Sequence, residues 1–359
     1  MDLILKRLGD LARQVVLGKG VTVAEAVSES LDDLSKDFPL VGEERLAELA
    51  EAELTGFGAL EPFMSDPMVE ELWMNKPNEL FVCKNGQTTR FEIDFSAEQQ
   101  AVAVDRMLRA IGRRVDRTMP FVDAPLDNGS RLHVVIPDVT RRFMSFNIRR
   151  YVQNQATLES LFLAGTMSES HLRALQLALA QRETIVISGP TAAGKTTLLS
   201  ALLRSLSDSE RVVSVEDTFE LSIPNLDWVA MQTRPASIEG LGAIDMRRLI
   251  REALRMRPGR LVVGEVRGAE AVELLVALNS GIPALCTVHA NSAEEAFGKL
   301  QTLPLLSGIE MPVTFLRQVL SSSISLIVHC NLTPAGVRTV EQIIRVSQSS
   351  GEARFANVA

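Results

Sequence analysis

The chain contains few cysteines, few aromatic residues and no long apolar run. Its three cysteines, Cys83, Cys286 and Cys330, lie far apart in 359 residues, which disfavours a disulfide framework or a structural zinc site and favours a reducing compartment. With two tryptophans and one tyrosine, the chain has little material for the base-stacking groove of a nucleic-acid motor. No apolar run approaches the roughly 18 residues that span a bilayer, so we expect no transmembrane segment.

Apolar and charged residues are present in ordinary amounts. Hydrophobic residues make up 46% and charged residues 23% of the sequence, which is enough to build two packed cores. The formal net charge is -8, and a negative field of this kind does not attract nucleic acid or anionic lipid. We therefore expect no direct nucleic-acid partner.

Residues 1–53 are predicted to form a helical N-terminal segment. Apolar side chains recur there with helical spacing, at Ile4, Leu8, Leu11 and Val15. The charges between them do not fit a secretory signal peptide. A helix that docks on its own chain or on a neighbour is favoured over one that contacts a membrane surface, because the low net charge and the acidic residues that follow weaken attraction to lipid.

Residues 54–150 are predicted to form a small α/β domain with antiparallel character. Short strands, two Asn-Gly turn signals and one helical pattern support this interpretation. The strands are expected near residues 69–74, 80–84, 90–93, 131–136 and 143–148, and the helix at 97–111. Residues 151–157 have no sustained apolar pattern and are predicted to be a linker.

Residues 158–346 are predicted to form a second α/β domain. Four β-branched runs alternate with helical patterns, which is typical of a mostly parallel sheet with helices on both faces. These runs are residues 184–187, 212–215, 261–263 and 284–288. Residues 347–359 are predicted to be a mobile tail.

A phosphate-binding motif follows the first of these runs. The segment GPTAAGKT, residues 189–196, matches G-x-x-x-x-G-K-[ST] between a strand and a helix. Gly189 and Gly194 let backbone N–H groups turn toward phosphate oxygens, and the helix N-terminus adds positive potential. Lys195 would neutralise the β- and γ-phosphates, and Thr196 would bind magnesium. The expected nucleotide-binding residues are Gly189, Pro190, Thr191, Ala192, Ala193, Gly194, Lys195, Thr196 and Thr197.

Polar side chains also follow the other three runs. Glu216 and Asp217 come after the second, with Glu220 close behind, and Glu265 comes after the third. A carboxylate at this edge of a sheet is suited to hold metal-bound water or to orient the attacking water. Asp217 and Glu220 also fit a role as turn caps. His289 ends the fourth run, where it fits a hydrogen bond to a phosphate or a purely structural role equally well.

Arginines supply charge for phosphate binding. Arg131 and Arg149 lie on predicted strands of residues 54–150, and Arg113 precedes them. A second group lies on one face of a predicted helix and is more typical of an interface or a solvated face: Arg248, Arg251 and Arg255.

Taken together, these segments resemble the motifs of the type II/IV secretion ATPase superfamily. GPTAAGKTTLL, SVEDTFEL, ALRMRPGRLVVGEVRGAEAVELL and TVHANS look like the P-loop, the acidic box, the Walker B segment and the histidine box. Upstream, GFGALEPFMSDPMVEELWMN, GRRVDRTMPFVDAPLDNGSRLHVVIP and the strand ending NIRR are similar to the N-terminal domain of the CpaF/TadA-like group. That group drives tight-adherence (Flp) pilus assembly, and the resemblance covers roughly residues 54–346.

The resemblance implies a hexameric ring ATPase that hydrolyses ATP with Mg²⁺ to drive pilus assembly. Each subunit would have an N-terminal domain, a flexible linker and a RecA-like C-terminal domain. Further copies of the chain and an inner-membrane platform protein would be its partners, and its place would be cytoplasmic, at the inner face of the membrane. Three alternatives stay open: a type IV secretion or conjugal transfer ATPase, a nucleic-acid motor, and a slow nucleotide-dependent assembly switch.

The resemblance also assigns roles to residues. Lys195 and Thr196 take the P-loop roles, and His289 is the histidine-box sensor. Glu216 is the acidic-box carboxylate and Glu265 the Walker B carboxylate. We favour Glu216 as the general base, with Glu265 organising magnesium through water, and the opposite assignment stays open.

The resemblance to the family extends to arginines but is incomplete elsewhere. Arg131 and Arg149 match arginines that approach the nucleotide from the N-terminal domain, and Arg113 is a further candidate. The chain lacks the cysteine-rich insert common in type II secretion ATPases, which points to the CpaF/TadA or conjugation-type branches. The segment NSGIPALC also lacks a Gly-Ser pair before the histidine box.

Overall fold

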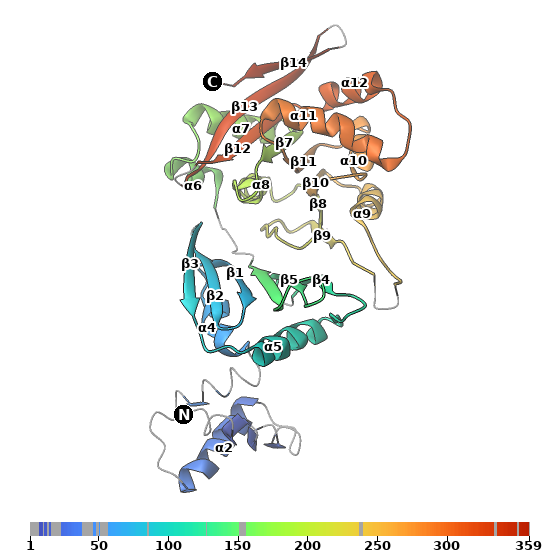
Figure 1. Ribbon diagram of the computed structural model, residues 1–359. Coiled ribbons are helices and arrows are strands. Elements are labelled where there is room, and N and C mark those ends of the chain that lie inside the picture. Colours follow the sequence, from blue (N-terminus) through green and yellow to red (C-terminus); the bar gives the residue numbers. More distant parts are fainter. Residues whose placement is uncertain are drawn as a thin grey trace. The chain divides into compact units, whose positions relative to one another are not determined.

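The computed structural model forms two compact units, Met1–Val152 and Gln153–Ala359 (Figure 1). Their division falls in the segment predicted to be a linker, of which residues 151–155 lie outside the described part. The structure describes residues 7–9, 11–12, 14–15, 23–37, 46–47, 50, 57–84, 86–126, 128–150, 156–236, 240–333, 336–349 and 352–358. No helix among these residues has the length and apolar character needed to cross a membrane.

The described part of the N-terminal segment is helical. Its longest helix is α2 (Val23–Asp37). Leu8 and Ala12 are fully buried against a cluster that includes Val27 and Leu34 of α2. This agrees with a helix that docks on its own chain, although Ile4 of the predicted apolar face lies outside the described residues.

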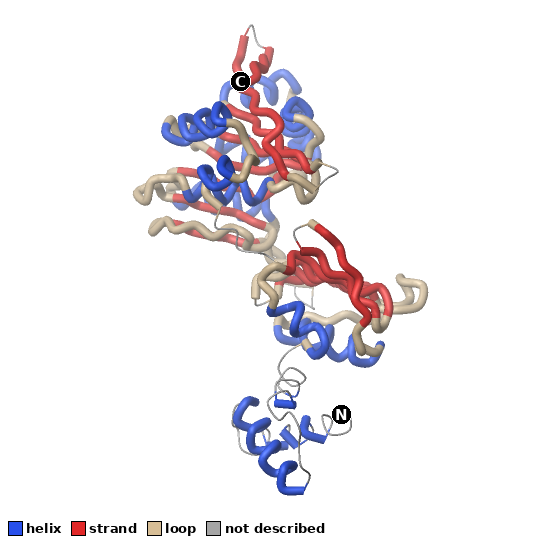
Figure 2. Tube along the Cα trace, turned by 90° about the vertical axis from the view of Figure 1, so that its left-hand side faces the viewer, coloured by secondary structure: helices blue, strands red, loops and turns tan. Residues whose placement is uncertain are grey.

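A six-stranded antiparallel sheet follows in the first unit. Its strand order is β3-β2-β1-β6-β5-β4. The strands are β1 (Val69–Lys76), β2 (Glu79–Lys84), β3 (Gln87–Glu92), β4 (Phe121–Pro125), β5 (Arg131–Val135) and β6 (Ser145–Arg149). Two short helices, η1 (Gly58–Leu60) and α4 (Glu61–Ser65), precede it, and α5 (Ala97–Ala110) interrupts it. Figure 2 shows the helices on one face of this sheet.

The helix α5 forms where the sequence predicts it, for two local reasons. Ser96 caps its N-terminus in a capping box with Gln99, which satisfies backbone donors of the first turn. Val104 and Leu108 recur at helical spacing and are buried against sheet residues such as Leu72. β4 was not predicted, because its sequence, FVDAP, mixes polar residues and proline with few apolar ones.

The second unit contains an eight-stranded sheet in the order β14-β13-β12-β7-β11-β10-β8-β9. All pairs from β12 to β9 are parallel, whereas β13 and β14 are antiparallel. The strands are β7 (Ile185–Gly189), β8 (Val212–Glu216), β9 (Trp228–Gln232), β10 (Arg260–Val266), β11 (Ala284–His289), β12 (Leu326–Leu332), β13 (Arg338–Ser349) and β14 (Glu352–Asn357).

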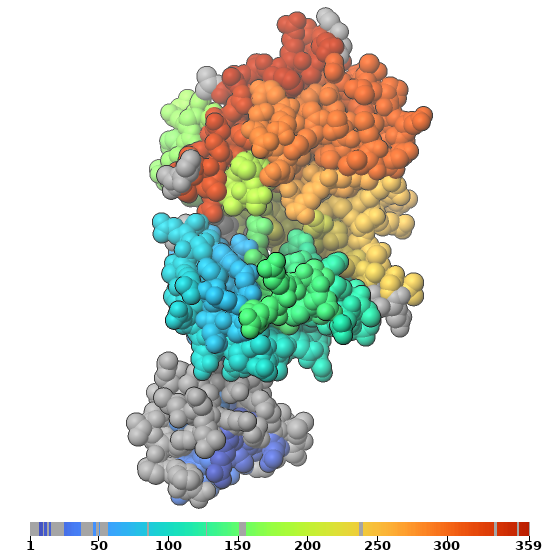
Figure 3. All heavy atoms as spheres, in the orientation of Figure 1, coloured from blue at the N-terminus to red at the C-terminus, as the bar shows by residue number. Residues whose placement is uncertain are grey.

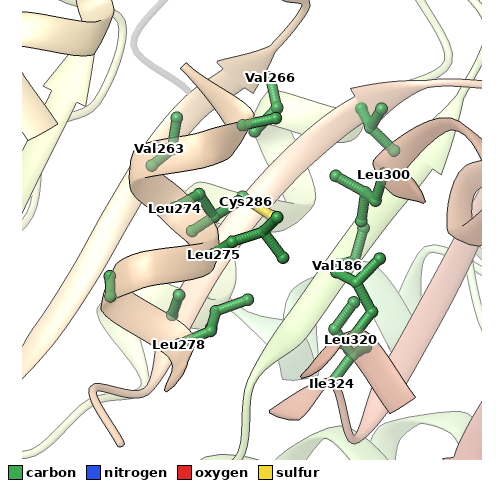
Figure 4. Close-up of a cluster of buried hydrophobic side chains, with 14 of the residues drawn as sticks. Val186, Val263, Val266, Leu274, Leu275, Leu278, Cys286, Leu300, Leu320 and Ile324 are labelled. Carbon is green, nitrogen blue, oxygen red and sulfur yellow. The ribbon is translucent and has the colours of Figure 1, made fainter. Parts of the chain in front are cut away.

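Helices cover both faces of this sheet. Ile185 packs with the helices of one face and the next residue, Val186, with those of the other, because successive strand residues point to opposite sides. Figure 4 shows Val186 and Cys286 of the sheet among helix residues such as Leu275 and Leu320. The helices are α6 (Leu158–Leu163), α7 (Glu169–Ala180), α8 (Lys195–Arg204), α9 (Met246–Ala253), η2 (Leu254–Met256), α10 (Ala271–Asn279), α11 (Ala293–Thr302), η3 (Leu303–Ser307) and α12 (Val313–Ser323). The predicted fold class, α/β with a mostly parallel sheet, is confirmed.

Residues 347–349 of the predicted mobile tail are the end of β13, so the prediction is wrong there, and it is also wrong for residues 352–357. These residues form β14, which is paired with β13 from Glu352 to Asn357. The Phe355 ring also meets the Phe297 ring edge-on, with 5.2 Å between centroids. The segment carries one large apolar residue, so its sequence has no strand periodicity; pairing with the long β13 makes it a strand.

Candidate nucleotide-binding site

The loop between β7 and α8 is built from residues in left-handed conformations. Gly189 has φ 152°, Ala192 62° and Gly194 89°. A Cβ atom at Gly189 would lie 2.4 Å from the carbonyl oxygen of Cys330 in β12. Only glycine fits at that position, because both the backbone conformation and the close approach exclude a side chain.

Lys195 holds its ammonium group inside this loop. Its Nζ donates to the carbonyl oxygens of Gly189, at 3.0 Å, and Pro190, at 2.9 Å. Ala193 N–H donates to the same Pro190 oxygen at 3.3 Å. The first turn of α8 begins at Lys195, so a positive side chain and the positive end of a helix meet at one place, which suits phosphate. The other predicted binding residues lie in this loop or turn: Thr191, Thr196 and Thr197.

The parallel pairing brings the other predicted residues of this unit to the same edge of the sheet. His289, the last residue of β11, lies opposite Gly189. β10 lies between β11 and β8, so Glu265 near the end of β10 and Glu216 at the end of β8 complete a row. Ligands of parallel sheets bind beyond this carboxyl edge.

Glu216 is the most buried carboxyl group of this row. It is 2% exposed, and its Oε2 accepts hydrogen bonds from the N–H groups of Glu220 and Leu221 at 2.8 and 2.9 Å. Its Oε1 is buried and has no hydrogen-bond partner within the described residues. Burial raises the pKa of Glu216 to about 7, although the two hydrogen bonds oppose the shift. A carboxyl group with this pKa both loses and accepts a proton at neutral pH.

Glu265 is tied to the acidic box by an arginine. Arg267 Nη2 donates to Glu265 Oε2 at 2.5 Å, and Arg267 Nη1 donates to Asp217 Oδ2 at 3.2 Å. Arg267 was not predicted as a site residue, because the sequence does not show that the residues after β8 and β10 lie side by side. Asp217 therefore has a partner beyond its own turn.

Two histidines lie at this edge in different environments. His289 is exposed, and its carbonyl oxygen accepts a hydrogen bond from Lys299 Nζ at 2.9 Å. His329 of β12 is 4% exposed, with its Nδ1 2.9 Å from Ser188 Oγ of β7. Burial lowers the pKa of His329, which favours the neutral ring. His329 was not predicted as a site residue, because only the pairing of β12 with β7 places it beside the P-loop strand.

The predicted arginines outside this edge belong to the first unit. Arg131 of β5 and Arg149 of β6 are cross-strand partners, so their side chains share one face of that sheet. Arg131 forms a two-point ion pair with Asp123, and Arg149 is exposed. Arg113 follows α5, where its N–H bonds to the Leu108 carbonyl oxygen at 2.7 Å.

The arginines predicted to share one helix face lie on α9 and on η2, which follows it, and they pair with carboxylates. Arg251 donates from Nε and Nη2 to Glu273 Oε1 of α10 at 2.9 and 2.7 Å. Arg248 of α9 and Arg255 of η2 both pair with Glu252, at 2.8 and 3.9 Å. These contacts support a packing or surface role for the group rather than a phosphate site.

Comparisons with known proteins agree with this geometry. The chain matches the sequence model of the type II/IV secretion system protein family over residues 53–356. A Mycobacterium tuberculosis protein named for conjugal transfer is 35% identical over 317 residues, which cover 86% of this chain and 89% of that protein. The type IV secretion system protein VirB11 of Bartonella quintana is 26% identical over 326 residues, with coverage of 80% and 91%. The solved structure of the pilus retraction motor PilT with bound ADP shares the fold, at 18% identity and a TM-score of 0.55, over 81% of this chain and 80% of that one. This chain therefore belongs to the type II/IV secretion system protein family.

Proposed function

We propose that this chain is the motor ATPase of a conjugal transfer or type IV secretion system. The observation that carries the proposal is the arrangement at one sheet edge, where a formed P-loop lies in the same row as the buried Glu216 carboxyl group, whose pKa is about 7. A phosphate cradle with a proton acceptor beyond it is the arrangement that nucleotide hydrolysis requires.

Lys195 and the loop N–H groups would bind the phosphates, and Glu216 would take a proton from the attacking water. The residues also fit Mg²⁺, which uses one or two protein oxygens together with substrate phosphates: Thr196 offers a hydroxyl and Glu265 a carboxylate at this edge. Mg²⁺, when bound, neutralises charge on the β- and γ-phosphates. Because Arg267 pairs with Glu265, the carboxylate would have to share or exchange that partner.

Arg131, Arg149 and Arg113 would add positive charge for the phosphates, in the same or a neighbouring subunit. Their support is the pairing of Arg131 with Arg149, which sets two guanidinium groups on one sheet face. The Asp123 carboxylate that holds Arg131 fixes the direction of that guanidinium group. His289 is proposed as the sensor, because it lies opposite Gly189 of the loop.

The secretion branch rests on the relatives. Motif resemblance favoured tight-adherence pilus assembly, but the two relatives are named for conjugal transfer and for type IV secretion. These names support a conjugal transfer or type IV secretion ATPase better than a pilus-assembly ATPase. Deleting the gene in its host tests the branch: conjugal transfer or protein export should fail, whereas loss of surface pili with transfer intact would return the proposal to pilus assembly.

We extend the proposal to assembly and location. The chain would act as a homohexameric ring on the cytoplasmic face of the inner membrane, bound to a membrane platform protein. Family membership supports an oligomer. The ring would convert nucleotide binding and release into movement of its domains.

Nucleotide binding is tested with Lys195→Ala. Removing the ammonium group that spans the loop should weaken ATP binding at least about tenfold, because a charged hydrogen-bond donor to phosphate is lost. Calorimetric titration with ATP measures this, and Lys84→Ala, which removes a lysine paired with Asp66 in the first unit, is the matched control. Equal affinity in the two variants would contradict the proposed site.

A further inference from the structure

The β12–β13 hairpin forms a wall beside the P-loop. β12 pairs with β7, and β13 pairs back onto β12. Two residues of β12 contact the start of the loop. The Cys330 carbonyl oxygen packs against Gly189, and His329 Nδ1 lies 2.9 Å from Ser188 Oγ. In the space-filling view its orange-red atoms lie beside the yellow-green atoms of α8 (Figure 3).

Arg338, the first residue of β13, contacts the middle of the loop. Its Nε donates to the carbonyl oxygen of Ala192 at 2.9 Å. Its aliphatic part packs on Gly194, where a Cβ atom would lie 3.6 Å from Arg338 Cδ. One side chain therefore contacts both left-handed residues that shape the second half of the loop.

The Ala192 carbonyl and the Ala193 N–H belong to one planar trans peptide, so they point in opposite directions. The Ala193 N–H and Lys195 Nζ both donate to Pro190 O, which places them together on the inner side of the loop. The Ala192 carbonyl is on the outer side, where Arg338 meets it. Without a donor there, this peptide could rotate and direct a carbonyl oxygen toward bound phosphate, which would repel it.

We propose that Arg338 is a positioning residue for phosphate binding. It anchors the Ala192 carbonyl on the outer side of the loop and thereby keeps the Ala193 N–H aimed inward. A charged donor suits this task, because hydrogen bonds from guanidinium to carbonyl oxygen are stronger than neutral ones. The inference rests on the proposed nucleotide binding and adds to it a residue outside the P-loop motif.

Titration of the full-length chain with ADP tests the inference. Arg338→Ala should raise the Kd for ADP about tenfold, because one charge-assisted hydrogen bond no longer holds the loop in the conformation that binds phosphate. Arg338→Lys, which keeps a charged donor, should recover most of that loss. The matched control is Arg345→Ala, because Arg345 lies on the same strand but pairs with Glu183 at 2.8 Å; it should bind ADP as the wild type does.

Hydrogen exchange of the nucleotide-free chain gives a second readout that a general loss of stability would not produce. Arg338→Ala should speed exchange of the amides of residues 191–194 while those of β12 and the rest of α8 stay protected.

If the wild type, Arg345→Ala and Arg338→Ala all bind ADP equally well, the role of Arg338 is overturned and the proposed nucleotide binding stands. A wild type that binds no ADP overturns the proposed function with it. Equal losses in Arg338→Ala and Arg338→Lys, with exchange raised throughout the unit, would mean a folding role and would also overturn it.

Discussion

At the scale of single residues, Glu216 combines burial with a pKa near neutral pH. Glu216 is the last residue of the buried strand β8. One oxygen of its carboxyl group accepts two backbone hydrogen bonds, and the other accepts none within the described residues. The free oxygen is where a water molecule would be oriented. Since burial sets its pKa at about 7, this carboxyl group is ionised above neutral pH and protonated below it.

The pKa of Glu216 predicts how ATP turnover changes with pH and what the substitution Glu216→Gln does to it. ATP hydrolysis should rise between pH 6 and pH 8 with an apparent pKa near 7, because only the ionised form accepts a proton. Glu216→Gln should bind ATP normally and lower kcat by about 10² or more, the usual worth of a general base. Steady-state assays and ATP titration measure both. Normal turnover in Glu216→Gln would assign the base to Glu265.

The same group makes stability depend on pH. The pKa of Glu216 is raised from 4.5 to about 7 in the folded chain, so the folded state binds more protons than the unfolded state between these values. The contribution to stability is fully present below pH 4.5 and is lost as pH rises through 7. Glu216→Gln should therefore increase the free energy of unfolding at pH 8, by up to about 3 kcal/mol, and should change it little at pH 4.5.

Denaturant unfolding at the two pH values measures this difference. The control is Glu310→Gln, since Glu310 is exposed between η3 and α12. Its effect on the free energy of unfolding should be the same at both pH values. A Glu216→Gln variant that is less stable than the wild type at pH 8 would show that the ionised carboxylate is favoured in the fold, against this account.

At the scale of elements, the close contact between β12 and the loop after β7 fixes the site. Gly189→Ala would place a methyl group 2.4 Å from the Cys330 carbonyl oxygen in a left-handed backbone. It should lower the free energy of unfolding by about 1–3 kcal/mol, the usual effect of overpacking, and should abolish ATP binding. Gly298→Ala in α11, where no atom lies within 4 Å of the new methyl group, should be neutral or stabilising by about 0.5–1 kcal/mol. Thermal unfolding compares the two, and equal effects would contradict the role of this contact.

Elements with a strong local signal were predictable from sequence. The P-loop and the four apolar runs of the second unit carry motif and composition together, and they became β7, α8, β8, β10 and β11. β14 was missed because its pairing with β13, rather than its own sequence, makes it a strand. The order of strands in a sheet cannot be read from local sequence patterns. Contacts that depend on this order could therefore not be predicted, such as those of His329 with Ser188 and of Arg338 with Ala192.

At the scale of the whole molecule, the chain joins two compact units, and its proposed work requires that the nucleotide state of one unit affect the other. The P-loop, Glu216 and Glu265 all lie in the second unit, whereas Arg131 and Arg149 lie in the first. If these arginines complete the site in a ring, hydrolysis depends on assembly as well as on the residues of one chain.

The most direct test is ATP turnover per chain, measured with magnesium across a range of protein concentrations while light scattering reports the mass of the same samples. The account predicts turnover that rises as the chain assembles into a ring. Absence of turnover at every concentration would contradict an ATPase, and constant turnover from a monomer would contradict a ring motor.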